Sequence, residues 1–414
     1  MQRRVVITGL GLISPFGIGK EIFWESLIEG RSGIRRLTRF DPTGYGCQVA
    51  GEIPDDSYKD LIEQRRLRRM SHVSQLASAG TIMALEDAGL HPSWSNPYTA
   101  GVIMGTAGGS FKEGLEQQSI LLERGAERIN PFLSISSMNI NALSAEVALT
   151  TQSRGPAFTI TGGCASSLYT LAIASDMIRS GTLDVCMTGG VESPLSPLLI
   201  SCLCRLQELT TSNAVPEHAS CPFDKNHNGL VPSEGCCILI LEERTHAEQR
   251  GAHIYGEIIG YALGCDAYTA YSLEPTGESA AHTLQQALAQ ADVTPNEIEW
   301  VNAHGSSCPD WDRKETRVLK RALGEAAYTI PISATKSMTG HAFGAAGSFQ
   351  VASTVLAMQN GCVPPTINLN APDPECDLDY IPHNARTLSP KICLVESFGY
   401  GGLNSFLLLR QESS

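Results

Sequence analysis

Three side chains that could carry nucleophilic and proton-transfer chemistry stand at glycine-flanked positions far apart in the chain. Cys164 follows Ala157-Phe-Thr-Ile-Thr-Gly-Gly163, a β-branched and aromatic run that ends in two glycines. A helix-like stretch begins at this cysteine, so free backbone N–H groups and the positive end of the helix macrodipole should stabilise a thiolate there. The local sequence therefore predicts an activated nucleophile, although most cysteines in proteins are inert packing residues.

Two histidines in the second half of the chain complete this candidate set. His304 follows the apolar run Trp300–Ala303 and so lies at the end of an expected strand, where α/β folds usually bind ligands. His341 lies in a small-residue loop that runs into a helix. Either histidine alone is more often structural, but both share the glycine-flanked context of Cys164. A metal site is the competing interpretation; the scattered positions, without HxxxH or CxxC spacing, argue against a metal.

Short apolar strands alternate with helix-period segments, which favours a layered α/β fold with buried, largely parallel sheets. The expected strands cover residues 5–8, 185–188, 236–241, 300–303, 392–395 and 405–409, and the expected helices cover 73–88, 164–181, 283–291 and 313–323. Gly9 and Gly11 predict a tight turn after the first strand. Ser14 stands where a dinucleotide-binding fingerprint needs its third glycine, so no nucleotide site is expected there.

The alternation repeats after a charged segment at 242–250, so we expect two domains, residues 1–250 with the cysteine and residues 251–414 with both histidines. Since no low-complexity linker separates them, the site should lie at their junction. The 13 cysteines lack CxxC pairs, and no secretory leader or membrane-length apolar run is present, which predicts free thiols in the cytoplasm. A net charge of −13 argues against nucleic acid or an anionic membrane as the main partner.

Four motifs in order resemble the signatures of the β-ketoacyl synthases. They are Thr161-Gly-Gly-Cys-Ala-Ser-Ser167, Asn302-Ala-His-Gly305 with Pro309 and Asp312, Lys336 with Gly340-His341, and Ser397-Phe-Gly-Tyr-Gly-Gly402 with Asn404. The resemblance spans Val5 to Phe406 and is closest to the bacterial elongating type II enzymes of fatty acid and polyketide synthesis. It implies the thiolase fold, in which two similar α/β halves form five αβαβα layers, and a dimer.

The resemblance also implies a reaction, the decarboxylative condensation of an acyl thioester with malonyl-acyl carrier protein. Cys164 would hold the acyl group, and neutral His304 and His341 would each offer an N–H to the malonyl thioester oxygen as carbon dioxide leaves. The backbone N–H groups of Cys164 and Tyr400 would form the oxyanion hole. No resident cofactor or metal is implied, because the phosphopantetheine arm arrives on the carrier protein.

Supporting positions follow the family pattern with departures. Lys336 resembles the family's invariant lysine and is expected to ion-pair with Asp312 or Glu315, whereas Gln350 replaces a usual glutamate and changes that network. Two threonines that contact the pantetheine arm in the family appear here as Ser306 and Cys308, and the thiol is the weaker donor. Phe398 and Tyr400 lie in the loop that gates the cysteine, where Tyr400 replaces a phenylalanine.

Two further features concern the substrates. Gly108 falls where fatty acid enzymes commonly place a bulky aliphatic residue, which predicts a wider acyl pocket and, together with Tyr400, a polyketide-type or unusual acyl chain; neutral drift is the alternative. A basic run coincides with the family's carrier-docking segment, although such runs are usually solvated helix faces. The expected docking residues are Arg65, Arg66, Arg68 and Arg69, extended by Arg128 and Arg205.

Other classes remain as alternatives. A chain-length-factor-like partner subunit shares the fold but lacks the nucleophile, so Cys164 disfavours it, and a priming or decarboxylating subunit remains open. A thiolase needs a second cysteine in the C-terminal glycine loop, which 399–402 lacks. A cysteine hydrolase would not need the second histidine. The partner in the dimer is either an identical chain or a chain-length-factor-like homologue.

Overall fold

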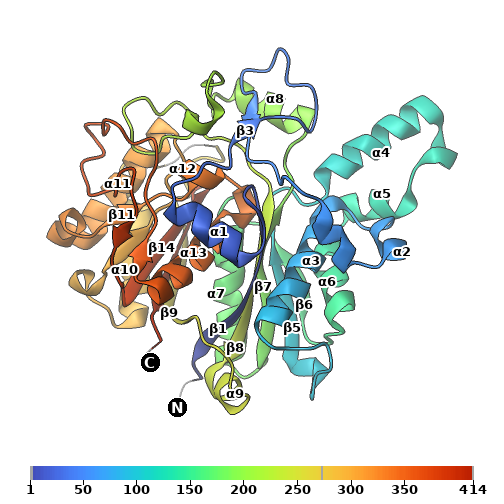
Figure 1. Cartoon of the computed structure of the whole chain (residues 1–414), viewed down its shortest axis with the longest axis horizontal. Helices are drawn as coiled ribbons and strands as arrows, with labels where there is room; N and C mark the ends of the chain where they lie inside the picture. The colour runs from blue at the N-terminus through green and yellow to red at the C-terminus, as the bar shows by residue number, and fades with distance from the viewer. Residues whose placement is uncertain (1–2, 272–273, 413–414) are drawn as a thin grey trace.

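A mixed sheet of eleven strands forms the centre of the described chain, residues 3–271 and 274–412 of a computed structural model (Figure 1). Its order is β11-β10-β14-β15-β9-β1-β8-β7-β5-β6, and β2 pairs with β1. The strands are β1 (Val5–Ser14), β2 (Gly17–Ile18), β5 (Ala100–Gly105), β6 (Ala157–Ile160), β7 (Val185–Glu192), β8 (Gly235–Glu243), β9 (Gly256–Cys265), β10 (Trp300–Asn302), β11 (Ile332–Ser333), β14 (Ile392–Gly399) and β15 (Leu403–Arg410). Two short pairs lie outside it, β3 (Arg35–Arg36) with β4 (Val49–Ala50) and β12 (Cys362–Val363) with β13 (Arg386–Thr387).

The expectation of largely parallel pairing is wrong for the middle of this sheet. Parallel ladders join β6, β5 and β7 at one end and β11, β10 and β14 at the other, where helical crossovers link the strands. Between them β1 pairs antiparallel with both β8 and β9, and β15 pairs antiparallel with β9 and β14. The β14–β15 hairpin agrees with the expected pairing of 392–395 with 405–409.

The helices form three layers, two on the outside of the sheet and one between its two halves. Helices α3 (His72–Asp87) and α6 (Ala142–Thr151) cover N-terminal strands, α10 (Glu278–Ala291) covers β9 and β15, and α11 (Pro309–Leu323) packs on α10. Between them α7 (Ser166–Arg179) and α13 (Ala346–Asn360) contact strands of both halves (Figure 1). The arrangement is the expected αβαβα sandwich. The division into domains at residue 250 stays a prediction.

Shorter elements complete the fold. The remaining helices are α1 (Lys20–Ile28), α2 (Gln64–Leu67), α4 (Phe111–Arg124), α5 (Pro131–Met138), α8 (Pro197–Arg205), α9 (Arg244–Gln249) and α12 (Lys336–Thr339). Single 3-10 turns occupy η1 (Ser57–Leu61), η2 (Pro97–Thr99), η3 (Ala126–Arg128), η4 (Pro216–His218), η5 (Pro295–Glu297), η6 (Gly324–Tyr328) and η7 (Phe343–Ala345). Helices α4 and α5 form an arm that projects from the body (Figure 1).

The glycines of the first strand have a packing role in place of the expected turn. Strand β1 continues through Gly9 and Gly11 to Ser14, with a register shift between Ile7 and Gly9. A Cβ at Gly11 would lie 1.9 Å from the carbonyl oxygen of Gly80 on α3, so only glycine permits this approach of helix to strand.

The cysteines are unpaired, as the sequence predicts: all 13 fall within the described residues and none forms a disulfide. Over the same residues, no helix combines the length and apolar character needed to cross a bilayer.

Candidate active site

The structure brings the three candidate side chains to one cavity. Cys164, His304 and His341 line a space of about 10 Å³ together with Phe398 and Tyr400. They come from the β6–α7 turn, the end of β10 and the loop after α12. Their exposed fractions are 5% for the cysteine and 2% for each histidine, so the reactive groups are enclosed.

Cys164 lies one residue before the N-cap of α7, with its carbonyl oxygen fixed by the Ser397 hydroxyl at 3.0 Å. Its thiol does not have the activated character that the sequence predicts. Burial raises the pKa of Cys164 to about 12, and although Lys336 favours the thiolate, Glu192 opposes it. In this closed chamber the cost of removing a thiolate from solvent exceeds its stabilisation by the N-terminus of α7, so the resting group is a neutral thiol.

The backbone fixes the proton position on both histidines. His304 Nδ1 accepts the amide N–H of Phe398 at 3.4 Å, and His341 Nδ1 accepts that of Phe343 at 3.1 Å. Burial, with a contribution from Lys336, holds the pKa of each imidazole well below its usual range. Because a neutral imidazole with an accepting Nδ1 carries its hydrogen on Nε2, each ring has one N–H donor available for a ligand.

Lys336 supports His304 through the backbone, and the expected ion pair with Asp312 or Glu315 is not formed among the described residues. Its Nζ donates to the carbonyl oxygen of His304 at 2.6 Å and to Gln350 Oε1 at 3.1 Å. Burial lowers the pKa of Lys336 to about 8, against the opposing charge of Glu315. Lys336 does not pair directly with Asp312 or Glu315, because both carboxylates already accept backbone amides of the His304 loop.

The two acids hold the loop that carries His304. Glu315 accepts the amides of His304 at 2.6 Å and Gly305 at 2.8 Å. Asp312 accepts the amide of Ser306 at 2.9 Å and also receives His227 Nδ1 at 2.9 Å. Both residues therefore position the histidine loop from the first turns of α11.

The predicted oxyanion donors lie on adjoining segments. A Cβ added to Gly163 would lie 3.6 Å from the amide nitrogen of Tyr400, so the cysteine turn and the Gly399–Gly402 turn approach closely. Within the described chain, neither the amide of Cys164 nor that of Tyr400 donates a backbone hydrogen bond outside helices and strands. The oxyanion hole formed by these two amides stays a prediction.

Ser306 and Cys308, the residues expected to contact the pantetheine arm, line the outer side of the Cys164 chamber, and their side chains bond to other parts of this chain. Ser306 Oγ accepts the amide of Cys308 at 3.2 Å and donates to Asp312 at 3.3 Å, while Cys308 Sγ donates to the carbonyl oxygen of Glu208 at 3.3 Å. Both groups are therefore engaged by their own chain. Cys308, Glu208 and Trp311 separate the small cavity from an outer one of about 600 Å³.

Sequence reasoning missed Trp311 and Glu208. The Trp311 ring meets Tyr400 edge to face at 5.7 Å and lies 6.0 Å from His304. A bulky aromatic two residues after Pro309, at the first turn of a helix that follows His304, was the available signal for Trp311. For Glu208 the sequence carries no such signal.

Gly108 lines a second pocket, and its assignment to the acyl chain stays a prediction. A pocket of about 240 Å³ adjoins the chamber at Tyr400, and its walls are mainly apolar. The lining includes Gly108, Gly163, Leu199, Leu203, Phe343 and Tyr400. A Cβ at Gly108 would lie 3.4 Å from Glu192 Oε1, so a larger side chain would project into this space.

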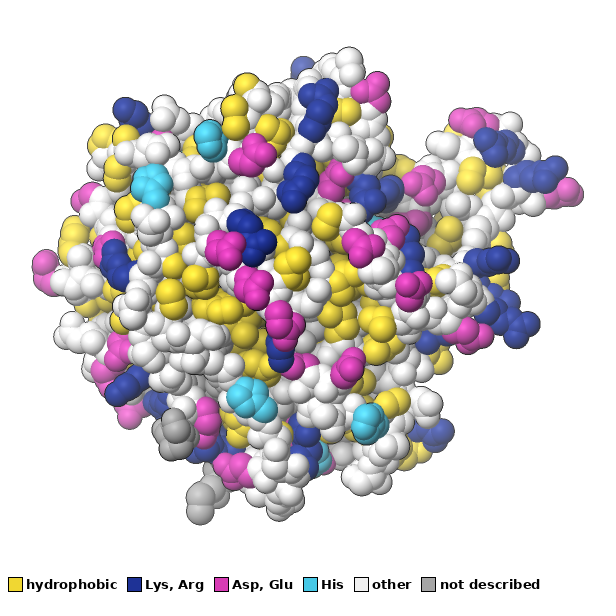
Figure 2. Space-filling view, in the orientation of Figure 1, with side chains coloured by type: hydrophobic (Ala, Val, Ile, Leu, Met, Phe, Trp, Pro, Cys, Tyr) yellow, Lys and Arg dark blue, Asp and Glu magenta, His cyan; other side chains and the backbone are white. Residues whose placement is uncertain are grey.

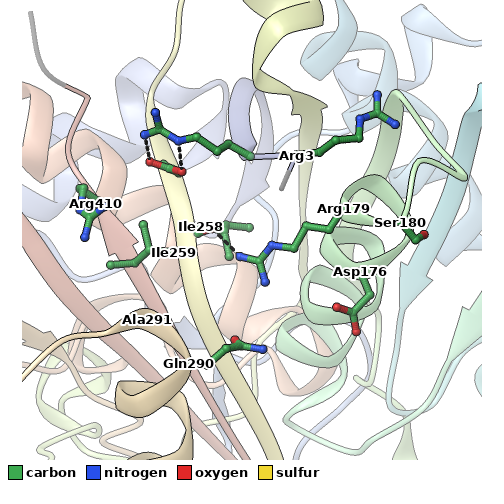
Figure 3. Close-up of a pocket in the computed structure, with 11 residues that line it drawn as sticks. Arg3, Asp176, Arg179, Ser180, Ile258, Ile259, Gln290, Ala291 and Arg410 are labelled. Carbon is green, nitrogen blue, oxygen red and sulfur yellow. Dashed lines mark hydrogen bonds and ion pairs between the residues drawn. The ribbon is translucent and has the colours of Figure 1, made fainter. Parts of the chain in front are cut away.

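A cavity of about 640 Å³ lies away from these residues (Figure 3). Its walls carry Arg3, Arg4 and Arg179, but Arg4 binds Glu257, Arg3 pairs with Asp184, and Arg179 donates to the carbonyl of Ile258 at 2.9 Å. These three arginines therefore already have partners within the protein.

The basic run, residues 65–69, begins in α2 and continues just past its end. Figure 2 shows Lys and Arg side chains over this region and the arm. Arg65, Arg68 and Arg128 are exposed, and Arg69 stacks on Phe132 at 4.7 Å. Arg66 departs from the expectation, because it is half-buried and bonds Glu146 at 2.9 Å. Arg205 is also exposed, at the end of α8.

A buried cysteine beside two neutral histidines, in a five-layered sandwich, defines a thiolase-like condensing enzyme. The chain belongs to the β-ketoacyl synthase family, since the sequence models "Beta-ketoacyl synthase, N-terminal domain" and "Beta-ketoacyl synthase, C-terminal domain" match residues 2–247 and 255–370.

Similar proteins come from two branches of the family. The chain is 40% identical to the 3-oxoacyl-[acyl-carrier-protein] synthase 2 of Synechocystis sp., over 99% of this chain and 98% of that protein. It is 39% identical to the granaticin polyketide putative beta-ketoacyl synthase 1 of Streptomyces violaceoruber, over 99% of each. Among solved structures, the ishigamide ketosynthase/chain length factor superposes with a TM-score of 0.93 at 33% identity over 100% of both chains.

Proposed function

We propose that this chain joins an acyl group held on Cys164 to a malonyl unit delivered by an acyl carrier protein, with loss of carbon dioxide, to give a β-ketoacyl thioester. The observation that carries the proposal is the shared cavity of Cys164 with two histidines whose Nε2–H groups are free to donate.

Chain loading is the first half of the reaction. The sulfur of Cys164 attacks the acyl thioester, the carbonyl oxygen takes the negative charge between the amides of Cys164 and Tyr400, and the carrier's thiol leaves with the proton that the cysteine lost. Since the resting thiol is neutral, loading needs solvent or substrate to enter the chamber and assist that transfer.

Carbon–carbon bond formation is the second half. As the carboxylate of the malonyl thioester leaves as carbon dioxide, its bonding pair passes to an enolate whose oxygen accepts from His304 and His341. The enolate carbon attacks the acyl-cysteine carbonyl, and collapse of the adduct releases the Cys164 thiolate, which takes one proton from solvent. Neutral histidines suit this role because a protonated pair would repel within one cavity.

We further propose that the carrier docks on the exposed arginines around α2. Acyl carrier proteins are acidic, and a local cationic surface on an acidic enzyme steers such a partner. Arg65, Arg68 and Arg69 supply this surface, with Arg128 in the η3 turn that joins α4 to α5 in the arm. A similar solved structure, 34% identical with a TM-score of 0.88, is described as a type II polyketide acyl-carrier protein in complex with its ketosynthase.

Assembly with a second thiolase-like chain is proposed from two exposed features. Strand β6 ends the sheet order, so its outer edge is open to pairing. The neighbouring arm exposes apolar side chains, including Leu122 at 76% and Met138 at 83%. Sedimentation analysis of the protein alone, and with a cysteine-less homologue, distinguishes an identical partner from a chain-length-factor-like one.

The acyl substrate is proposed to be a polyketide-type or otherwise unusual chain. Support comes from the pocket that Gly108 leaves open and from the Tyr400 ring between that pocket and the chamber. A fatty acid role is the second candidate, supported by the similarity to the 3-oxoacyl synthase of Synechocystis sp..

One experiment tests the reaction itself. The protein and Cys164→Ala are incubated with a panel of acyl carrier proteins, read by intact mass, and then supplied with malonyl carrier. Acyl mass on the wild type alone, followed by a β-ketoacyl product, supports the proposal. Acyl mass retained on Cys164→Ala, released free acid, acetyl-CoA exchange, or decarboxylation without elongation each points to one of the other classes.

A further inference from the structure

Glu396 is a fully buried acid on β14, directly behind the catalytic loop. Both of its carboxyl oxygens are enclosed, and neither accepts a hydrogen bond from a donor among the described residues. The Glu315 carboxyl lies within hydrogen-bond reach, with Lys336 as the nearby cation. Two acceptor carboxylates that face each other inside a protein cannot both be ionised, so a proton belongs between them.

We propose that Glu396 is a positioning residue: it stays protonated and donates a hydrogen bond to Glu315. Glu396 thereby supplies the acidic group that position 350, a glutamine in this chain, lacks. The inference deepens the proposed condensation and rests on it, because its effect is exerted on His304.

The placement of the proton on Glu396 follows from the donors around each acid. Burial raises the pKa of Glu315 as well, but Glu315 accepts the amides of His304 and Gly305, and these two donors favour its ionised form. Glu396 has no such donors and is surrounded by protein. Burial, reinforced by the charge of Glu315, raises the pKa of Glu396 well above its usual range. Asp312 adds a further negative charge near Glu315.

Gln350 fits this arrangement better than a glutamate would. Its Nε2 lies 3.0 Å from the carbonyl oxygen of Asn302, 2.7 Å from that of Ala303 and 3.1 Å from that of Glu396, while its Oε1 accepts from Lys336. A carboxylate at position 350 could not donate to these three carbonyls. The amide at 350 and the acid at 396 are therefore two parts of one network.

Glu396 also begins the segment that fixes the reacting groups. The next residue, Ser397, holds the carbonyl oxygen of Cys164, and the amide of Phe398 donates to His304 Nδ1. Loss of the Glu396–Glu315 bond would weaken two contacts that hold His304. One is the bond from the His304 amide to Glu315, and the other is the bond from the Phe398 amide on β14 to His304 Nδ1.

The experiment compares Glu396→Gln with Glu396→Leu. Glutamine keeps a neutral donor toward Glu315, so kcat should stay within about threefold of wild type with the same pH profile. Leucine removes the donor, so Glu315 keeps only its bonds to the His304 and Gly305 amides, and kcat for malonyl decarboxylation should fall about tenfold or more. Its pH profile should also shift, while intact mass still shows acylation of Cys164.

Glu257→Leu is the control, because Glu257 is a buried strand acid that binds Arg4 far from the site. Equal losses in Glu396→Gln and Glu396→Leu would overturn the neutral-donor role. Wild-type kinetics in Glu396→Leu would overturn any positioning role. If Glu396→Leu does not fold, the infrared carbonyl band of a protonated acid decides: it should be lost in Glu396→Gln, and its persistence there overturns the proposal without bearing on condensation.

Discussion

The imidazole rings of His304 and His341 meet edge to face with their centroids 5.2 Å apart. Each ring is anchored at Nδ1 by a backbone amide, so the pair presents two N–H donors that no side-chain rotation can withdraw without breaking an anchor. Such prepositioned donors stabilise developing charge more than mobile ones because they need no reorganisation during the reaction.

The first prediction concerns these donors. His304→Ala and His341→Ala should each lower carbon dioxide release from malonyl carrier by about 100- to 1000-fold, the usual effect of removing one such donor. Loading of Cys164 should continue, since the thiol is unchanged. Release of labelled carbon dioxide and intact mass of the acyl-enzyme measure the two steps separately. An equal loss of both steps would show that the histidines act on loading as well.

The second prediction concerns the pH dependence of the cysteine. The thiolate is the form that reacts with iodoacetamide, and a pKa of about 12 leaves Cys164 almost wholly protonated at neutral pH. The alkylation rate should therefore rise about tenfold per pH unit between pH 7 and 10. Peptide mass spectrometry follows this rate, with exposed Cys202 as the internal measure of reagent. A rate that levels off near pH 7 would mean an activated thiolate.

A third prediction tests the acyl pocket. Gly108→Ile should shorten the acyl chains that load or block bulky ones, because the side chain would enter the 240 Å³ pocket. Gly108→Ala is the matched control, since its Cβ meets only ordinary contact with Glu192 at 3.4 Å. Loading profiles across carriers of different chain length give the readout. The same profile for all three proteins would contradict a channel at this glycine.

A fourth prediction tests carrier docking. The double substitution Arg65→Glu and Arg68→Glu should lower kcat/KM for carrier-borne substrate by about tenfold at low salt and much less at high salt, because exposed charges are screened. Arg35→Glu is the control, an exposed arginine on β3. Kinetics at two ionic strengths provide the test, and a loss that does not depend on salt would argue for misfolding over docking.

The sequence predicted elements where a local pattern was complete. Helix α3 and the β14–β15 hairpin follow periodicity and a glycine turn, and three side chains met because each stood at the end of a strand or a helix. The antiparallel centre of the sheet and the role of Gly11 were missed, since both depend on which segments approach in space. No spacing reveals that Lys336 and Glu315 hold His304 by its backbone, or that Tyr400 and Trp311 help to bury Cys164, whose pKa burial raises.

The size of the chamber bears on how long a loaded enzyme survives. A space of about 10 Å³ is close to the least that holds one water molecule. An acyl-cysteine formed there is shielded from hydrolysis while the Tyr400 and Trp311 rings enclose it, and entry of the extender also admits water. The fraction of chains lost as free acid is therefore set by whether the extender or a water molecule reacts first, more than by the intrinsic reactivity of the thioester.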